Sequence, residues 1–166
     1  MNGVYIRSLS LEDFTQRALP FLDRGLPSEV KRSLSIDYVR QIMPLVQERA
    51  RTLAEVAELT EFFFVDELDY DSSLLIGKNM SRESAKQALE VAQQRLQQLE
   101  SFDIESLEAL LRPLAEELGL KTGQLFGTLR VAVTGRTAAP PLFQTIAVLG
   151  KERCLKRIEA ALNKLK

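Results

Sequence analysis

The fold of this chain is decided by residues 129–162, LRVAVTGRTAAPPLFQTIAVLGKERCLKRIEAAL. The first part belongs to an apolar helical run, KTGQLFGTLRVAVTG, that ends at Gly135, a residue typical of helix C-terminal caps. After the loop RTAAPP, Pro141 suits the first turn of a helix over PLFQTIAVLG. Gly150 then separates this helix from KERCLKRIEAALNKLK, in which apolar residues recur at helical spacing. The stretch predicts three consecutive helices joined by short turns.

The same periodicity continues toward the N-terminus. Asp103 opens DIESLEALLRPLAEELG, and Ser81 is the expected N-cap of SRESAKQALEVAQQRLQQLE, although no full capping box follows it. Three further helices are expected behind Ser10, Ser35 and Thr52, the last with Glu55 at the capping-box position.

The segment VDELDYDSSLLIGKN, residues 65–79, is acidic and has no clear period, so it is the expected junction between two parts of the chain. No stretch shows the sustained alternation of a β-strand. The sequence therefore predicts an all-α protein of two helical subdomains, residues 1–74 and 75–166.

The composition excludes several kinds of catalytic and metal-binding site. The chain has 166 residues, no histidine and one cysteine. It therefore holds no Ser-His-Asp or Cys-His system, no histidine metal site and no internal disulfide. No apolar run approaches the length of a membrane span, and the start has no export signal, so we expect a cytoplasmic protein without membrane contact.

The net charge of −1 hides an uneven distribution. Residues 1–54 carry 8 basic and 6 acidic side chains, residues 55–120 carry 5 and 15, and residues 121–166 carry 9 and 2. A basic end beside an acidic middle can present one surface to a polyanion and repel it elsewhere. Solvated helix faces would give the same blocks of charge.

Two candidate sites are better explained as ordinary structure. The carboxylates Asp66, Glu67, Asp69 and Asp71 could bind a hard cation, but they lack the spacing of a calcium loop and fit a solvated acidic loop. Cys154 lies at helical spacing from apolar residues, which favours a buried packing role over a reactive thiol.

The C-terminal cations are the stronger candidates. Arg153 and Arg157 share one face of the last helix with Lys156 beside them, while Arg130, Arg136 and Lys151 bracket the loop from Gly135 to Pro141. Guanidinium groups around a rigid apolar loop suit single-stranded RNA, although only Phe126 and Phe143 supply aromatic surface nearby. A basic C-terminal helix is also common on proteins that bind no RNA.

At residues 129–162 the sequence closely resembles the end of bacterial-type glutamyl-tRNA synthetases. The resemblance is carried by Arg130, by Thr134-Gly135, by the loop from Pro140 to Leu142, and by Leu149-Gly150-Lys151. It extends upstream through LEALLRPLAEELGLKTGQL and MPLVQERARTLAEVAELTEFFF to MNGVYIR, and so covers essentially the whole chain.

This resemblance implies an α-helical anticodon-binding region of two subdomains, the second a helical cage. The parent enzyme would be a glutamate–tRNA ligase, a class I synthetase that uses ATP and Mg²⁺ in a catalytic half. The signature motifs of that half are absent from this chain, so we expect the fragment to have no cofactor and no enzymatic activity of its own. Its expected partners are the anticodon stem-loop of glutamate tRNA and the catalytic half, and we expect a monomer.

The resemblance also assigns residues. Arg49 matches an arginine that reads the third anticodon base, and Arg130, Pro140 and Leu142 match residues that line the pocket for the first two bases. Ala139 stands where the family often has Thr or Ser, so a hydroxyl contact is lost there.

We further expect Arg136, Lys151, Lys156 and Arg157 to contact phosphates. The alternative from a different class is a helical protein-interaction module whose charged blocks dock a protein partner. A small helical enzyme using carboxylates and arginines would be a third reading.

Overall fold

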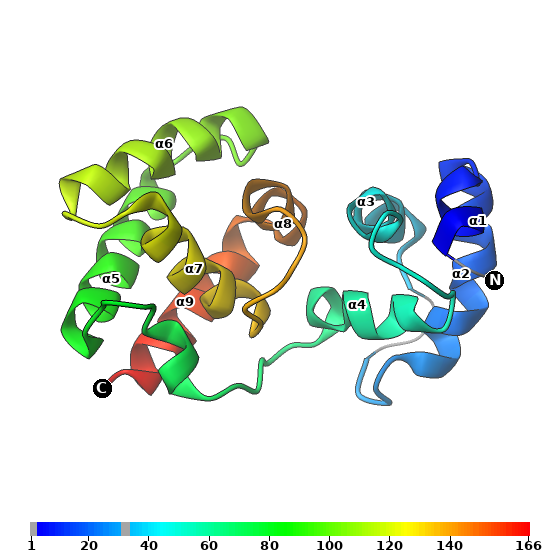
Figure 1. Ribbon diagram of the computed structural model, residues 1–166, viewed down its shortest axis with the longest axis horizontal. Helices are drawn as coiled ribbons and strands as arrows, with labels where there is room; N and C mark the ends of the chain where they lie inside the picture. The colour runs from blue at the N-terminus through cyan, green and yellow to red at the C-terminus, as the bar shows by residue number, and fades with distance from the viewer. Residues whose placement is uncertain (1–2, 31–33) are drawn as a thin grey trace. The chain divides into compact units, whose positions relative to one another are not determined.

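The computed structural model describes residues 3–30 and 34–166, and every regular element in that part of the chain is a helix (Figure 1). The first four helices are α1 (Gly3–Ser8), α2 (Leu11–Gly25), α3 (Ile36–Val46) and α4 (Glu55–Phe64). The short 3-10 helix η1 (Ser72–Leu75) is followed by α5 (Arg82–Gln98), α6 (Ile104–Glu117), α7 (Thr122–Thr134), α8 (Leu142–Leu149) and α9 (Lys151–Lys164). The predicted all-α class is confirmed.

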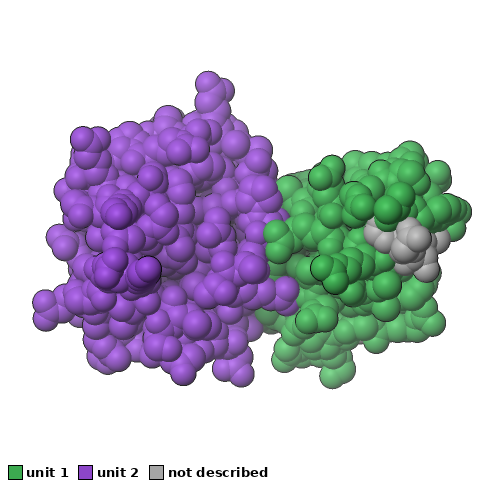
Figure 2. Space-filling view, in the orientation of Figure 1, with its two compact units in different colours: residues 1–66 green, residues 67–166 purple. Residues whose placement is uncertain are grey.

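The helices form two compact units, which Figure 2 distinguishes by colour: unit 1 ends at Asp66 and unit 2 spans Glu67–Lys166. η1 packs within unit 2, because Leu75 is fully buried and its carbonyl accepts a hydrogen bond of 2.9 Å from Thr128 Oγ1 in α7. A functional division at residues 74 and 75 stays a prediction, and residues 1, 2 and 31–33 of the predicted first subdomain lie outside the described residues.

The expected N-caps of α2 and α3 are confirmed. Ser10 accepts a hydrogen bond from Asp13 N at 3.2 Å, and Ser35 accepts one from Tyr38 N at 3.4 Å. These hydroxyls satisfy amide groups that the first turn of a helix leaves without a partner.

The expected N-cap of the fourth helix is wrong. Thr52 Oγ1 accepts a hydrogen bond from Glu55 N at 3.3 Å, but α4 begins only at Glu55, and the Glu55 carboxylate accepts a bond from Arg51 N at 2.9 Å. The capping-box residues therefore close a turn ahead of the helix instead of starting it.

Side-chain hydrogen bonds join the helices of unit 1. Gln47 Nε2, just after α3, donates to the carbonyls of Ile6 and Leu9 at 3.0 and 2.9 Å. Tyr38 OH in α3 donates to Phe63 O in α4 at 2.7 Å. Both ends of α3 are thus held by groups distant in sequence.

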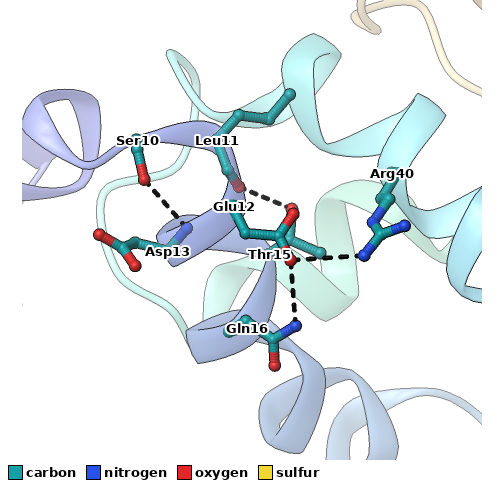
Figure 3. A network of polar contacts seen from close by, with 7 residues as sticks. All are labelled: Ser10, Leu11, Glu12, Asp13, Thr15, Gln16 and Arg40. Atoms are coloured by element: carbon teal, nitrogen blue, oxygen red, sulfur yellow. Dashed lines mark hydrogen bonds and ion pairs between the residues drawn. The ribbon is translucent and has the colours of Figure 1, made fainter.

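A surface network joins α2 to α3 in the same unit (Figure 3). Glu12 Oε1 accepts hydrogen bonds from Gln16 Nε2 at 3.3 Å and from Arg40 Nη2 at 3.4 Å. The Glu12 and Arg40 side chains are 59% and 50% exposed, so this ion pair contributes little to stability.

The N-termini of α5 and α6 are both capped by side chains, and the cap of α5 is more complete than the sequence indicates. Ser81 accepts a bond from Ser84 N, and Ser84 Oγ accepts one from Ser81 N at 2.9 Å, which completes a reciprocal capping box with serine in the place of glutamate. Asp103 Oδ1 accepts a bond from Ser106 N at 2.7 Å and caps α6 as expected.

The helices of unit 2 enclose one apolar core, consistent with the expected helical cage. α9 packs against α5, α7 and α8, while α6 packs against α5, α7 and α8 (Figure 1). The fully buried side chains of this core include Leu89, Leu96, Leu107, Leu111, Leu125, Leu129, Ile146 and Ile158. The core of unit 2 therefore draws on all five of its α-helices.

Left-handed glycines end two of these helices. After α6, Gly119 has φ +71°, and the bonds Gly119 N to Glu116 O and Leu120 N to Ala115 O form a Schellman motif. After α7, Gly135 has φ +73°, and its N–H donates to Val131 O at 2.7 Å. A Cβ at residue 135 would lie 3.3 Å from Tyr70 Cδ1, whereas a Cβ at residue 119 would meet no atom within 4 Å.

Alanine substitutions at the two glycines distinguish the free-energy cost of backbone strain from the cost of close packing. Gly119→Ala should lower the free energy of unfolding by about 1–2 kcal/mol, the cost of a side chain in the left-handed region. Gly135→Ala should cost more, because the new methyl group also meets the Tyr70 ring. Urea unfolding of both variants measures the difference, and equal losses would show that the contact with Tyr70 has no energetic weight.

Candidate nucleic-acid interface

The loop between α7 and α8 is held at both ends by threonine hydroxyls. Thr134 Oγ1 donates to Arg130 O at 2.6 Å and accepts from Arg136 N at 3.1 Å. At the other end, Thr145 Oγ1 donates to Pro141 O at 2.8 Å. The sequence indicated the Thr134-Gly135 pair at the helix end, but it indicated neither hydroxyl contact and gave no role to Thr145.

Arg130 lies in the last turns of α7, next to this loop, and is half-buried. Within the described part of the chain its guanidinium group has no hydrogen-bond or ion-pair partner. A planar group with five N–H donors is therefore held at the surface beside a fixed loop, which suits the acceptor edge of a base.

The other two residues assigned to the pocket are buried. Pro140 is buried in the loop, and Leu142, the first residue of α8, is 5% exposed. Thr137, Ala138 and Pro141 are the exposed members of the loop. Pro140 and Leu142 therefore anchor the loop, and the surface that a ligand could meet is formed by their neighbours and by backbone groups.

The four cations expected to contact phosphates occupy different environments. Lys156 is exposed and forms a weak ion pair with Glu152 at 3.7 Å, with side chains 77% and 88% exposed. Lys151 Nζ donates to Leu99 O at 2.9 Å, beyond the last turn of α5. Arg136 is half-buried in the loop after α7.

Arg157 is the buried member of this set. Its side chain is 4% exposed, and Nη1 donates to Val133 O at 2.6 Å, at the C-terminal end of α7. A cation is stabilised at that end of a helix by the unpaired carbonyls and the helix dipole. Burial raises the pKa of the nearby Tyr70 phenol to about 12, although the charge of Arg157 opposes that shift. The helical spacing of Arg153 and Arg157 did not reveal which of them points inward.

Arg49 lies in unit 1, in the turn that follows α3, and is exposed. Its N–H donates to Val46 O at 3.0 Å, which fixes the backbone of the turn. The structure thus presents Arg49 at a helix end, on a different compact unit from Arg130.

Cys154 is fully buried, with Sγ 3.7 Å from Ile146 O, and burial raises the pKa of its thiol to about 12. The predicted packing role is confirmed.

In the acidic segment, Asp71 caps η1 by accepting a hydrogen bond from Ser73 N, which lowers the pKa of the Asp71 carboxyl group. The described residues contain no group of histidine, cysteine and carboxylate side chains that could hold a metal ion.

Sequence reasoning noted Phe126 and Phe143 but missed the side chain that joins them. Arg112 in α6 lies over both rings, with its guanidinium carbon 5.9 Å from the Phe126 centroid and 5.7 Å from the Phe143 centroid. The three residues come from three helices, so no local spacing could have indicated the cluster.

Comparison with known proteins gives a consistent picture. The family model for the anticodon binding domain matches residues 13–162. The chain is 50% identical to a glutamate–tRNA ligase of Dehalococcoides mccartyi strain CBDB1 over 165 residues, covering 99% of this chain and 34% of the relative. It is 51% identical to one of Roseiflexus castenholzii, covering 99% and 33%. The chain thus spans about a third of the length of these curated relatives.

The fold has a counterpart of known structure. The crystal structure of a glutamate tRNA ligase from Elizabethkingia meningosepticum matches with a TM-score of 0.81 and 23% identity, covering 99% of this chain and 31% of that one. Among the described residues, no helix is both long and apolar enough to cross a membrane.

Two adjacent residues of α9 should differ sharply in their effect on stability. Arg157→Met removes a buried charged hydrogen bond to Val133 O and should lower the free energy of unfolding by about 1.5–3 kcal/mol. Lys156→Met, at an exposed position, should change it by less than about 0.5 kcal/mol. Urea unfolding distinguishes the two, and a fully stable Arg157→Met variant would contradict the structural role of Arg157.

Proposed function

Because this chain belongs to the anticodon-binding domain family, we propose that it recognises the anticodon of glutamate tRNA as the C-terminal part of a glutamate–tRNA ligase. The observation that carries the proposal is the family match over residues 13–162, which extends over most of both compact units. The arrangement of Arg130 beside the fixed α7–α8 loop supports it independently.

The chemistry at Arg130 fits an unstacked base. Proteins read single-stranded RNA by hydrogen bonds to base edges and by packing against splayed bases. Arg130 supplies the donors, and the loop, held by Thr134 and Thr145, supplies a rigid edge. We assign the first two anticodon bases to the surface formed by Arg130 and this loop. The buried side chains of Pro140 and Leu142 anchor the loop.

Arg49 is proposed to read the third base. Glutamate anticodons end in C, and glutamine anticodons end in G. A guanidinium group can donate to the O2 and N3 acceptors of an unpaired cytosine, whereas guanine presents N1–H and N2–H₂ donors on the same edge. The exposure of Arg49 at the end of α3 is compatible with such a contact.

The activity of the whole ligase is part of the proposal. ATP and Mg²⁺ would be bound by the catalytic part outside this chain, where glutamate would be activated. This chain would contribute recognition, act as a monomer, and work in the cytoplasm together with that catalytic part. A protein-interaction module is the outcome to expect if no anticodon stem-loop binds.

Substitution of Arg49 tests the assignment of the third base. Labelled stem-loops with glutamate anticodons ending in C, and the same loops ending in G, are titrated against the chain at two salt concentrations. The wild-type chain should prefer C, and Arg49→Gln should narrow the gap by roughly 1–3 kcal/mol. Arg51→Gln, at an exposed position two residues away, is the matched control and should retain the gap. Full preference in Arg49→Gln would refute the assignment.

Substitution of Lys156 tests the phosphate contacts. Because Arg157 is buried, Lys156→Gln is the cleaner variant. It should weaken all stem-loops equally and reduce the slope of log K against log salt by about 0.7 to 1. Lys86→Gln on α5, a helix that also carries Glu83 and Glu90, should leave the slope unchanged. A loss confined to one anticodon would contradict a phosphate contact.

A further inference from the structure

Three helices of unit 2 bring an arginine and two phenylalanines together at the surface. The rings of Phe126 in α7 and Phe143 in α8 are 5.2 Å apart with an interplanar angle of 82°. The guanidinium carbon of Arg112 in α6 lies within 6 Å of both ring centroids. Both rings are half-buried and Arg112 is 55% exposed, so the cluster is accessible from solvent.

The electrostatics of this cluster favour a flat neutral ligand over a phosphate. Glu108, one turn before Arg112, accepts a hydrogen bond from Arg112 Nε at 2.6 Å. The carboxylate offsets the charge of the guanidinium group and would repel an anion close to it. What remains is a planar guanidinium beside two aromatic rings, a surface on which nucleobases stack irrespective of sequence.

The cluster also adjoins the residues assigned to base reading. Phe126 lies one helical turn before Arg130 on α7, so the two side chains are neighbours on the helix surface. Phe143 follows Leu142 directly at the start of α8. An RNA loop whose bases are splayed at Arg130 would place the adjacent nucleotide within reach of the two rings.

We propose that Arg112, Phe126 and Phe143 form a stacking site for one unpaired base of the anticodon loop, adjacent to the bases read at Arg130. The proposal rests on the proposed function and adds to it a contact that secures the loop without reading its sequence. Because stacking on this site neutralises no phosphate, it contributes affinity that is independent of salt.

The absence of tryptophan makes the site directly observable. The chain has no Trp, so Phe143→Trp places the one tryptophan of the variant in the proposed site, where its fluorescence can be excited apart from that of the tyrosines. Binding of the glutamate stem-loop should quench its fluorescence, and an abasic substitution at one loop position should abolish the quenching while the loop still binds. Phe21→Trp, at a half-buried phenylalanine below Arg24 in α2, is the matched control and should show no quenching.

Affinity measurements with Phe143→Leu provide the second test. Binding of the stem-loop should weaken about fivefold or more, with the salt slope unchanged, whereas Phe21→Leu should bind as the wild type does. The abasic loop identified above should bind wild type and Phe143→Leu equally, because the same contact is lost in both. Circular dichroism of Phe143→Leu shows whether the helices are retained.

The outcomes separate this inference from the proposed function. Stem-loop binding without quenching in Phe143→Trp, or with full affinity in Phe143→Leu, would overturn the stacking site while the proposed function stands. The same result is expected if the three residues bind a protein partner instead of a base. If no stem-loop binds the wild-type chain, both proposals fail.

Discussion

The reversal of the backbone at the C-terminal end of α7 is the constraint on which unit 2 depends. Gly135 adopts a left-handed conformation there, and its lack of a side chain allows Tyr70 to approach. Arg157 reaches the same helix end from α9 and donates to the carbonyl of Val133. Segments far apart in the sequence therefore meet at one helix terminus, whose carbonyls would otherwise lack partners.

The same helix end sets the geometry of the candidate interface. Thr134 connects the last turn of α7 to the loop by bonding to the backbone of Arg130 and Arg136. Arg130 projects from a helix whose end is anchored, and the loop beside it starts from a fixed conformation. The arrangement suits recognition, because a ligand that meets a pre-organised surface loses less free energy in ordering it.

Charge counts overstate how many cations in the C-terminal part are available to a polyanion. Lys151 and Arg157 both donate to carbonyls near helix C-termini, at Leu99 and Val133. Lys156 is the exposed cation of this group on α9, and Arg112, from the acidic middle of the chain, joins the surface cluster with Phe126 and Phe143. Net charge records residue types, whereas burial and partners determine which charges reach solvent.

The sequence by itself determined the helical class, the N-caps at Ser10, Ser35, Ser81 and Asp103, and the helix end at Gly135, because helical periodicity, capping and backbone conformation depend on residues within a few positions. It failed at Thr52, where the same local signal closes a turn ahead of the helix. Only the tertiary structure decided that Arg157 is buried and that Arg112 meets two phenylalanines. These outcomes depend on which helix faces pack together, and contacts between residues distant in the chain leave no periodic trace in the sequence.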